Sequence, residues 1–223
     1  MDNLTCLLGK NIELELSGKI QHIGILTDFG KDILVIYNGE KFLYIPLTHI
    51  HHFQLYQTMD NSLDIEVPEK SGLEMPADRI SYRNTLYNAK GIFSEIYVAG
   101  NHSFHGYVRN VLSDYFVFYS PIHRMVFISL YHLKWLIPYP DNRIPYSLHT
   151  DRFPADESAI TFARTFKEQI KKMEGRMVML DLGETANKAG LLSKVDDTII
   201  ELVMPYEQKL YWNTQHIKTI SMA

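Results

Sequence analysis

The chain has 223 residues, of which 46% are hydrophobic and 22% charged, proportions close to those of an average globular protein. Its net charge of −4 argues against broad, non-specific nucleic-acid binding, and its single cysteine, Cys6, excludes an intrachain disulfide and a thiolate metal cluster. No stretch resembles a secretory signal or reaches the roughly 18 apolar residues of a membrane span, so we expect a cytoplasmic protein outside the membrane.

Four marker residues recur in the same order in three segments of the chain. Each segment has a glycine, a second glycine 15 residues later, then an aspartate, and finally a histidine that precedes an aliphatic residue. Because the period is 82 to 84 residues, we predict three tandem domains, at residues 1–56, 77–137 and 155–223. The segments are residues 8–53 (segment one: Gly9, Gly24, Asp32, His49), 89–136 (segment two: Gly91, Gly106, Asp114, His132) and 173–220 (segment three: Gly175, Gly190, Asp197, His216).

The composition within each segment is typical of β-strands. Residues 12–16 alternate apolar and acidic side chains, as a half-buried strand does. Residues 33–37, 115–119 and 198–203 are β-branched or aromatic runs, which predict more buried strands. We expect the paired glycines at sharp bends or close backbone approaches. The recurring aspartates stand at strand entries, where a carboxylate commonly accepts hydrogen bonds from turn amides.

A short helix is predicted before each segment. The clearest covers Asp156–Met173, where Asp156 can cap the first turn and two lysines in the last turn complement the helix dipole. Residues 76–89 and 2–8 are shorter versions of this pattern. Between segments two and three, residues 137–154 hold four of the nine prolines, which predicts a semi-extended linker.

A short N-terminal helix followed by five strands with this glycine and aspartate spacing resembles the Sm-like small-barrel family. Residues 4–53 carry the closest match, through Gly9, Leu16, Gly18, Gly24, Leu26 and Asp32. The resemblance implies a mainly β fold of three tandem Sm-like five-stranded small barrels, each preceded by a short helix. It also implies self-assembly, because barrels of this family pair through their edge strands.

The chain is also similar to small-barrel domains of Bacillus-type bacteria, some of them linked to the spore coat, which implies an association with spores. The RNA-binding members of the Sm-like family carry an asparagine shortly after the aspartate and an Arg-Gly or Lys-His pair in their second motif. This chain has neither, since the second motif reads PLTHI, SLYHL and NTQHI at residues 46–50, 129–133 and 213–217. We therefore do not expect the family's uracil pocket in any segment.

Three histidines in the stretch IPLTHIHHF, residues 45–53, invite comparison with a metal site. His49 recurs as His132 and His216, so we expect it to support the turn before the last strand of each segment. His51 and His52 do not recur, and consecutive strand residues point to opposite faces of a sheet. We therefore predict neither a metal site nor a cofactor.

Segment two differs from the others in charge and in aromatic content. Residues 77–136 contain six lysines and arginines against three acids, and 13 of the 27 aromatic residues. Such a combination can bind single-stranded nucleic acid or a protein partner, but packing of the run at 115–119 in a core explains the aromatics without any ligand and is the favoured interpretation. The candidate binding residues are Arg83, Arg109, Arg124, Lys134 and Trp135.

The sequence contains no nucleophile motif, P-loop, G-x-G-x-x-G or H-E-x-x-H pattern, so we expect a protein that is not an enzyme. Our leading hypothesis is a scaffold or assembly module, because three fused barrels supply half the edges of a six-membered ring. The alternative is a single-stranded RNA-binding module centred on segment two. An enzyme with a site between barrels is a third option for which the sequence offers no residue set.

Overall fold

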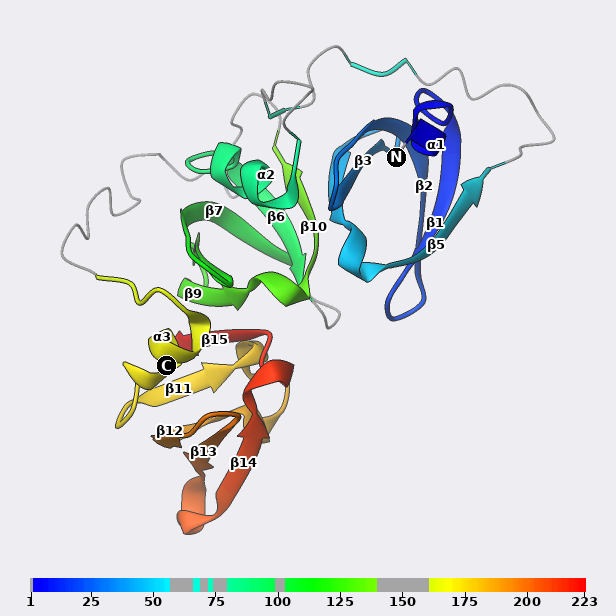
Figure 1. Cartoon of the computed structure of the whole chain (residues 1–223). Helices are drawn as coiled ribbons and strands as arrows, with labels where there is room; N and C mark the ends of the chain where they lie inside the picture. The colour runs from blue at the N-terminus through cyan, green and yellow to red at the C-terminus, as the bar shows by residue number, and fades with distance from the viewer. Residues whose placement is uncertain (1, 57–65, 69–71, 74–79, 99–102, 140–160) are drawn as a thin grey trace. The chain divides into compact units, whose positions relative to one another are not determined.

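The computed structural model describes residues 2–56, 66–68, 72–73, 80–98, 103–139 and 161–223. The fold is mainly β, with antiparallel strands and a few short helices (Figure 1). None of the described helices is long and apolar enough to cross a membrane. The chain divides into two compact units: unit 1 contains Met1–Phe104 and Leu133–Arg143, and unit 2 contains His105–His132 and Ile144–Ala223. Segment two contributes strands to both units, and the division into three domains stays a prediction.

Unit 1 contains seven of the described strands in the order β6-β10-β4-β3-β2-β1-β5. Its buried core includes the inward-facing residues of β1, together with Trp135 and Ile137 of β10. The elements are α1 (Asp2–Thr5), β1 (Asn11–Leu16), β2 (Ile20–Phe29), β3 (Ile33–Tyr37), β4 (Phe42–Pro46), β5 (Ile50–Leu55), α2 (Tyr82–Asn88), β6 (Phe93–Val98) and β10 (Leu133–Pro138).

Unit 2 contains eight of the described strands in the order β14-β13-β12-β11-β15-β9-β8-β7. Its core joins Tyr115, Val117 and Phe127 of β8 and β9 to α3 and to the inner face of the later strands. The elements are β7 (Ser103–Val111), β8 (Tyr115–Ser120), β9 (Arg124–Ser129), α3 (Phe166–Lys171), β11 (Met177–Leu180), β12 (Ala189–Val195), β13 (Ile199–Val203), β14 (Lys209–Asn213) and β15 (Thr219–Met222).

The same strand order occurs in both units. Strands β1 to β4 pair consecutively and β5 returns to β1, while β11 to β14 pair consecutively and β15 returns to β11. The predicted buried strands at 33–37 and 115–119 are confirmed as β3 and β8. The run at 198–203 also forms a strand, β13, but only Ile200 and Leu202 of it are buried and Ile199 is exposed, so the prediction of a buried strand is wrong there. A register shift interrupts β2, β7 and β12, at the same distance from the recurring glycine in each.

Gly24, Gly106 and Gly190 lie where two backbones approach closely, as expected from the sequence. A Cβ atom would stand 2.6 Å from the carbonyl oxygen of Tyr37 at Gly24 and 2.0 Å from that of Tyr119 at Gly106. At Gly190 it would stand 2.8 Å from the carbonyl oxygen of Val203. Because real Cβ atoms do not approach an oxygen so closely, each site requires glycine.

The predicted helices exist but are shorter than expected. Helix α3 begins at Phe166, and residues 161–165 are not helical, so the prediction of a continuous helix over Asp156–Met173 is wrong for this part; Asp156 lies outside the described residues. The cap is Thr165, whose hydroxyl accepts the N–H of Glu168 while the Glu168 carboxylate accepts the N–H of Thr165. This capping box is readable in the sequence as Thr-x-x-Glu.

Each recurring histidine ends a short 3-10 turn; a strand follows at once after His49 and His132 and two residues later after His216. These turns are Leu47–His49, Leu130–His132 and Thr214–His216, and they lead into β5, β10 and the segment before β15. This agrees with the turn-supporting position predicted for the histidines. Among the described residues there is no group of three or more metal-ligating side chains.

Candidate functional site

In each unit, one helix and one strand attach to strands that come earlier in the chain, and they do so through the same kinds of contact. In unit 1, Oδ1 of Asp32 accepts the backbone N–H of Tyr82, the first residue of α2, at 2.8 Å. In unit 2, Oδ1 of Asp114 accepts the N–H of Phe166, the first residue of α3, at 2.7 Å. We call these the α2 junction and the α3 junction. The sequence predicted that these aspartates bind turn amides, but these bonds reach a helix about fifty residues further along the chain.

Strand pairing completes each junction. In the α2 junction β10 pairs with β4, with Leu136 opposite Tyr44. In the α3 junction β15 pairs with β9, with Ile220 opposite Phe127. Each junction therefore combines one carboxylate at a helix start with one antiparallel strand pair.

The α3 junction is also packed with aromatic side chains. The Tyr115 hydroxyl lies 2.7 Å from the carbonyl oxygen of Ala163 and 3.2 Å from Oε1 of Gln169. The Tyr115 and Phe166 rings lie 5.7 Å apart between centroids. Burial, followed by the negative charges of Asp114 and Glu168, raises the pKa of Tyr115 well above its usual value. The phenol therefore stays protonated and donates its hydrogen bond at physiological pH.

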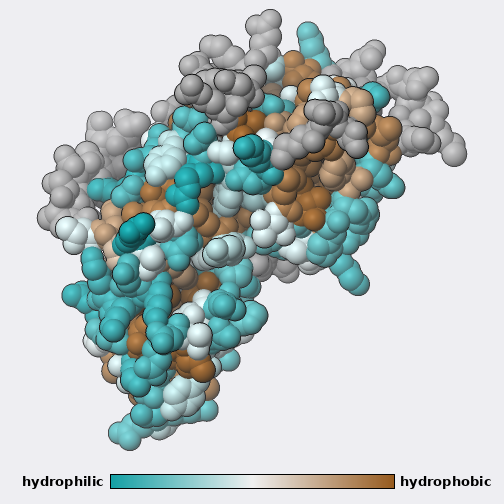
Figure 2. Space-filling model, in the orientation of Figure 1, coloured by the Kyte–Doolittle hydropathy of each residue, from teal (hydrophilic) through white to brown (hydrophobic). Residues whose placement is uncertain are grey.

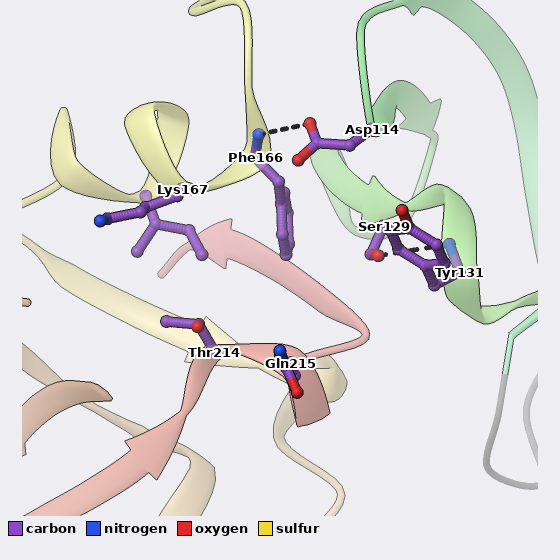
Figure 3. Close-up of a pocket in the computed structure, with 8 residues that line it drawn as sticks. Asp114, Ser129, Tyr131, Phe166, Lys167, Thr214 and Gln215 are labelled. Carbon is purple, nitrogen blue, oxygen red and sulfur yellow. Dashed lines mark hydrogen bonds between the residues drawn. The ribbon is translucent and has the colours of Figure 1, made fainter. Parts of the chain in front are cut away.

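A pocket of about 420 Å³ opens at the α3 junction (Figure 3). Figure 3 shows the Phe166 ring reaching from α3 towards the turn that carries Thr214 and Gln215, while Lys167 extends away from Asp114. The volume is within the range of small-molecule sites. Two of the charged lining residues already have partners within the protein, however: one oxygen of Asp114 accepts the Phe166 amide, and Lys167 pairs with Asp197. The lining residues are Asp114, Ser129, Tyr131, Phe166, Lys167, Ile170, Thr214 and Gln215.

The third aspartate of the sequence pattern does not occupy the equivalent place. The carbonyl oxygens of Asp32 and Asp114 accept the N–H groups of Leu47 and Leu130, and the matching bond in segment three runs from Thr214 to Thr198. The equivalent residue is therefore Thr198, and the alignment of Asp197 is wrong by one position. The Asp197 side chain is 97% exposed and pairs with Lys167.

A buried ion pair that the sequence did not reveal lies in segment three. The Asp181 side chain is 6% exposed, and its Oδ2 atom lies 2.9 Å from Nζ of Lys188. Its other oxygen accepts the N–H groups of Lys218 and Thr219, which lead into β15. Asp181 thus ties the turn after β11 to the strand that enters the α3 junction. In the sequence this pair is only an acid and a lysine seven residues apart, a spacing too common to predict an ion pair.

The five candidate binding residues are distributed over both units. Arg83, Lys134 and Trp135 belong to unit 1, whereas Arg109 and Arg124 belong to unit 2. Lys134 is 5% exposed and its ammonium group donates to the carbonyl oxygen of Ser17 at 2.6 Å. Trp135 is 7% exposed and stacks on Tyr97 at 4.1 Å. These two residues are therefore occupied in packing β10 within unit 1.

Arg109 and Arg124 lie on strands of the same three-stranded part of unit 2. Arg109 lies at the register shift of β7, and Arg124 begins β9 and is exposed. A guanidinium nitrogen of Arg124 donates to the Tyr119 hydroxyl at 3.0 Å. Of the five candidates, only Arg124 is exposed.

Similarity to known proteins is consistent along the whole chain. A family model described as the YwrJ third domain matches residues 165–220. A Bacillus subtilis (strain 168) protein described as "Uncharacterized protein YwrJ" is 41% identical over 224 residues, which cover 100% of both chains. The chain belongs to the YwrJ family. The YwrJ third-domain match begins at Thr165, the cap of α3, and ends within β15, so it contains the helix and the strand that enter the α3 junction.

The α3 junction gives a first testable prediction. Replacing Asp114 by alanine is expected to lower the free energy of unfolding by about 1–2 kcal/mol, because the N–H of Phe166 loses its acceptor at the start of α3. Chemical denaturation followed by circular dichroism measures the change. The matched control is Asp197→Ala, which is expected to leave the unfolding transition unchanged, because water screens the exposed carboxylate. Equal effects of the two substitutions would contradict the assigned role of Asp114.

Proposed function

We propose that this chain is a non-enzymatic assembly module made of three tandem Sm-like barrels. The strand order shared by β1–β5 and β11–β15 supports this proposal, as do the three glycines at close backbone approaches. The description of the matching family model as a third domain also supports it. In this proposal the α2 and α3 junctions are the contacts between successive barrels.

The observation that carries the proposal is a difference between covered and uncovered edge strands. Strands β4 and β9 are paired on both sides; all of β4 and the last four residues of β9 are buried. Within the described part of the chain, β5 has a neighbour on one side only, β1, and β14 has only β13. An edge strand with unpaired backbone groups is a template for a further strand. The two outer edges are therefore the natural attachment points of a partner.

The partner in this proposal is a protein, either a second molecule of the same chain or another strand-donating protein. Two chains that pair at both edges would close a ring of six barrels. The proposed cellular role is as a scaffold associated with the spore coat, supported by the resemblance of the sequence to small-barrel domains of Bacillus-type bacteria.

Sedimentation of the full chain tests the assembly function. We expect the weight-average mass to rise above the 25.9 kDa of one chain as the concentration increases from micromolar to tens of micromolar. Pull-down from growing and sporulating cells, with nuclease treatment of half of each sample, identifies other partners. A strict monomer at tens of micromolar that also captures no protein from either lysate would refute the proposal.

Single-stranded RNA binding is the second candidate function, supported by Arg124 at the surface of unit 2 and by Arg109 on a strand of the same unit. It predicts binding of a labelled oligonucleotide with a modest salt dependence, because few phosphates can be neutralised. Reversing both charges, as Arg109→Glu with Arg124→Glu, is expected to abolish that binding. An unchanged affinity would exclude this function.

A further inference from the structure

The two junctions place the same kind of residue pair at the same position. Leu136 of β10 stands opposite Tyr44 of β4, and Ile220 of β15 stands opposite Phe127 of β9. In each case the aliphatic residue is the fourth after the histidine that ends the preceding 3-10 turn. The strand pairs of the two junctions therefore have the same register, and the two edge strands, β14 and β5, have residues at the equivalent positions.

Strand β14 provides the equivalent of the aromatic position. Tyr44 is opposite Val35 and Phe127 is opposite Val117 within their own hairpins. The corresponding pair in segment three is Tyr211 opposite Glu201. The Tyr211 side chain is 64% exposed, in contrast to its two buried counterparts.

Strand β5 provides the equivalent of the aliphatic position. The fourth residue after His49 is Phe53, which packs against the core of unit 1 from β5. It stands opposite Leu14 of β1, so its side chain points to the inner face of its own strands. Leu136 and Ile220 likewise face buried positions. Phe53 on β5 and Tyr211 on β14 thus have the orientation that the internal junctions use.

We propose that β5 of one molecule pairs antiparallel with β14 of another molecule, with Phe53 opposite Tyr211. This inference rests on the proposed assembly function and adds the partner, the direction and the register of the contact. Since the two edges differ, the contact is head-to-tail, and it leads to a closed ring or to an open filament. The same register places Leu55 opposite Lys209.

The contact between molecules is weaker than the internal junctions and exchanges on dilution. Glu201 replaces the buried valines of the internal hairpins and lies 3.1 Å from Lys209, so this pair loses water contacts when a strand covers it. Thr198 also replaces the aspartate that binds the helix in both internal junctions. In Figure 2, hydrophilic residues cover most of the visible surface of β11–β14, interrupted by smaller hydrophobic patches. Such a mixed surface suits reversible association.

Disulfide trapping tests the register. In a Cys6→Ala background, full chains carrying Phe53→Cys are mixed with chains carrying Tyr211→Cys under mild oxidation. Directly opposite residues of an antiparallel pair have Cα atoms about 4.5–5.5 Å apart, which a disulfide can bridge. We expect a mixed dimer on a non-reducing gel at least about tenfold more abundant than with either variant alone. A second pair, Leu55→Cys with Lys209→Cys, serves if Phe53→Cys lowers the melting temperature, since both positions are exposed.

The control separates register from random collision. Leu55→Cys mixed with Tyr211→Cys is shifted by two residues from the proposed register and is expected to give only the background yield of cross-linked dimer. The same is expected when Tyr211→Cys is mixed with Ile122→Cys, whose position is exposed in a turn outside both edge strands. Equal yields in matched and shifted mixtures would overturn the register, and efficient homodimers of Tyr211→Cys would overturn the direction. If the parent chain still assembles in sedimentation in those cases, the assembly function stands. A monomeric parent chain without any cross-link refutes both.

Discussion

Replacing Asp181 by alanine is expected to lower the free energy of unfolding of unit 2 by about 3–5 kcal/mol, the usual cost of removing one partner of a buried ion pair. The substitution leaves the Lys188 ammonium, whose side chain is 13% exposed, with only Glu184 as its partner among these acids. It also removes the acceptor of the Lys218 and Thr219 amides before β15. The α3 junction depends on β15, so we expect the junction to loosen as well. Urea unfolding monitored by tryptophan fluorescence measures the loss.

The control for Asp181 is an exposed ion pair of the same unit. Asp196 and Lys194 are 2.9 Å apart, with side chains 60% and 63% exposed. Because water screens this pair, Asp196→Ala is expected to cost less than about 0.5 kcal/mol. If Asp181→Ala behaves like Asp196→Ala, the buried pair does not hold β15 in place.

Replacing Gly106 by alanine is expected to destabilise unit 2 by about 3 kcal/mol or more, which is at the upper end of the cost of overpacking. The new Cβ atom would stand 2.0 Å from the carbonyl oxygen of Tyr119 and 2.9 Å from its carbonyl carbon. Both atoms belong to backbone, so neither a rotamer change nor a small side-chain shift relieves the overlap. Strands β7 and β8 would have to separate at this point. Hydrogen exchange measures the change, as a loss of protection of the amides of β7 and β8.

Gly175→Ala is the matched control for Gly106→Ala in the same unit. Gly175 has a φ of +78° and no atom within 4 Å of an added Cβ. Its substitution introduces only the backbone strain of the left-handed region, about 1–2 kcal/mol. A cost at Gly106 no larger than at Gly175 would show that the two strands are less close than the structure indicates.

Much of the fold was predictable because the strands and turns depend on local sequence. Alternation in residues 12–16 and the apolar runs at 33–37 and 115–119 predicted β1, β3 and β8 correctly. Helix α3 was predicted too long, because apolar residues stand near helical spacing on both sides of the Thr165–Glu168 capping box, where the helix begins. The alignment of Asp197 was wrong because an aspartate stands directly before Thr198, which is the residue at the same distance from the preceding glycine as Asp32 and Asp114.

The partners of the recurring aspartates could not be predicted. The strand entry at Asp114 is a local feature, but the Phe166 amide that it binds is distant in sequence. The same holds for Lys134 and Trp135, whose charge and aromatic ring indicated a binding surface until β10 was placed beside β4 and β6. A residue's type limits which interactions it can make, while its exposure depends on which strands surround it.

The amino-acid sequence by itself determined the mainly β class, the positions of four strands (β1, β3, β8 and β13), and the spacing of the recurring glycines and histidines. These features follow from side-chain patterning and from backbone sterics, which act over a few residues. Only the tertiary structure decided which strand edges are covered, because strand pairing between distant residues depends on how whole sheets pack. Pairing on both sides buries β4, β10 and the last four residues of β9, whereas β5 and β14 have one neighbour each among the described strands.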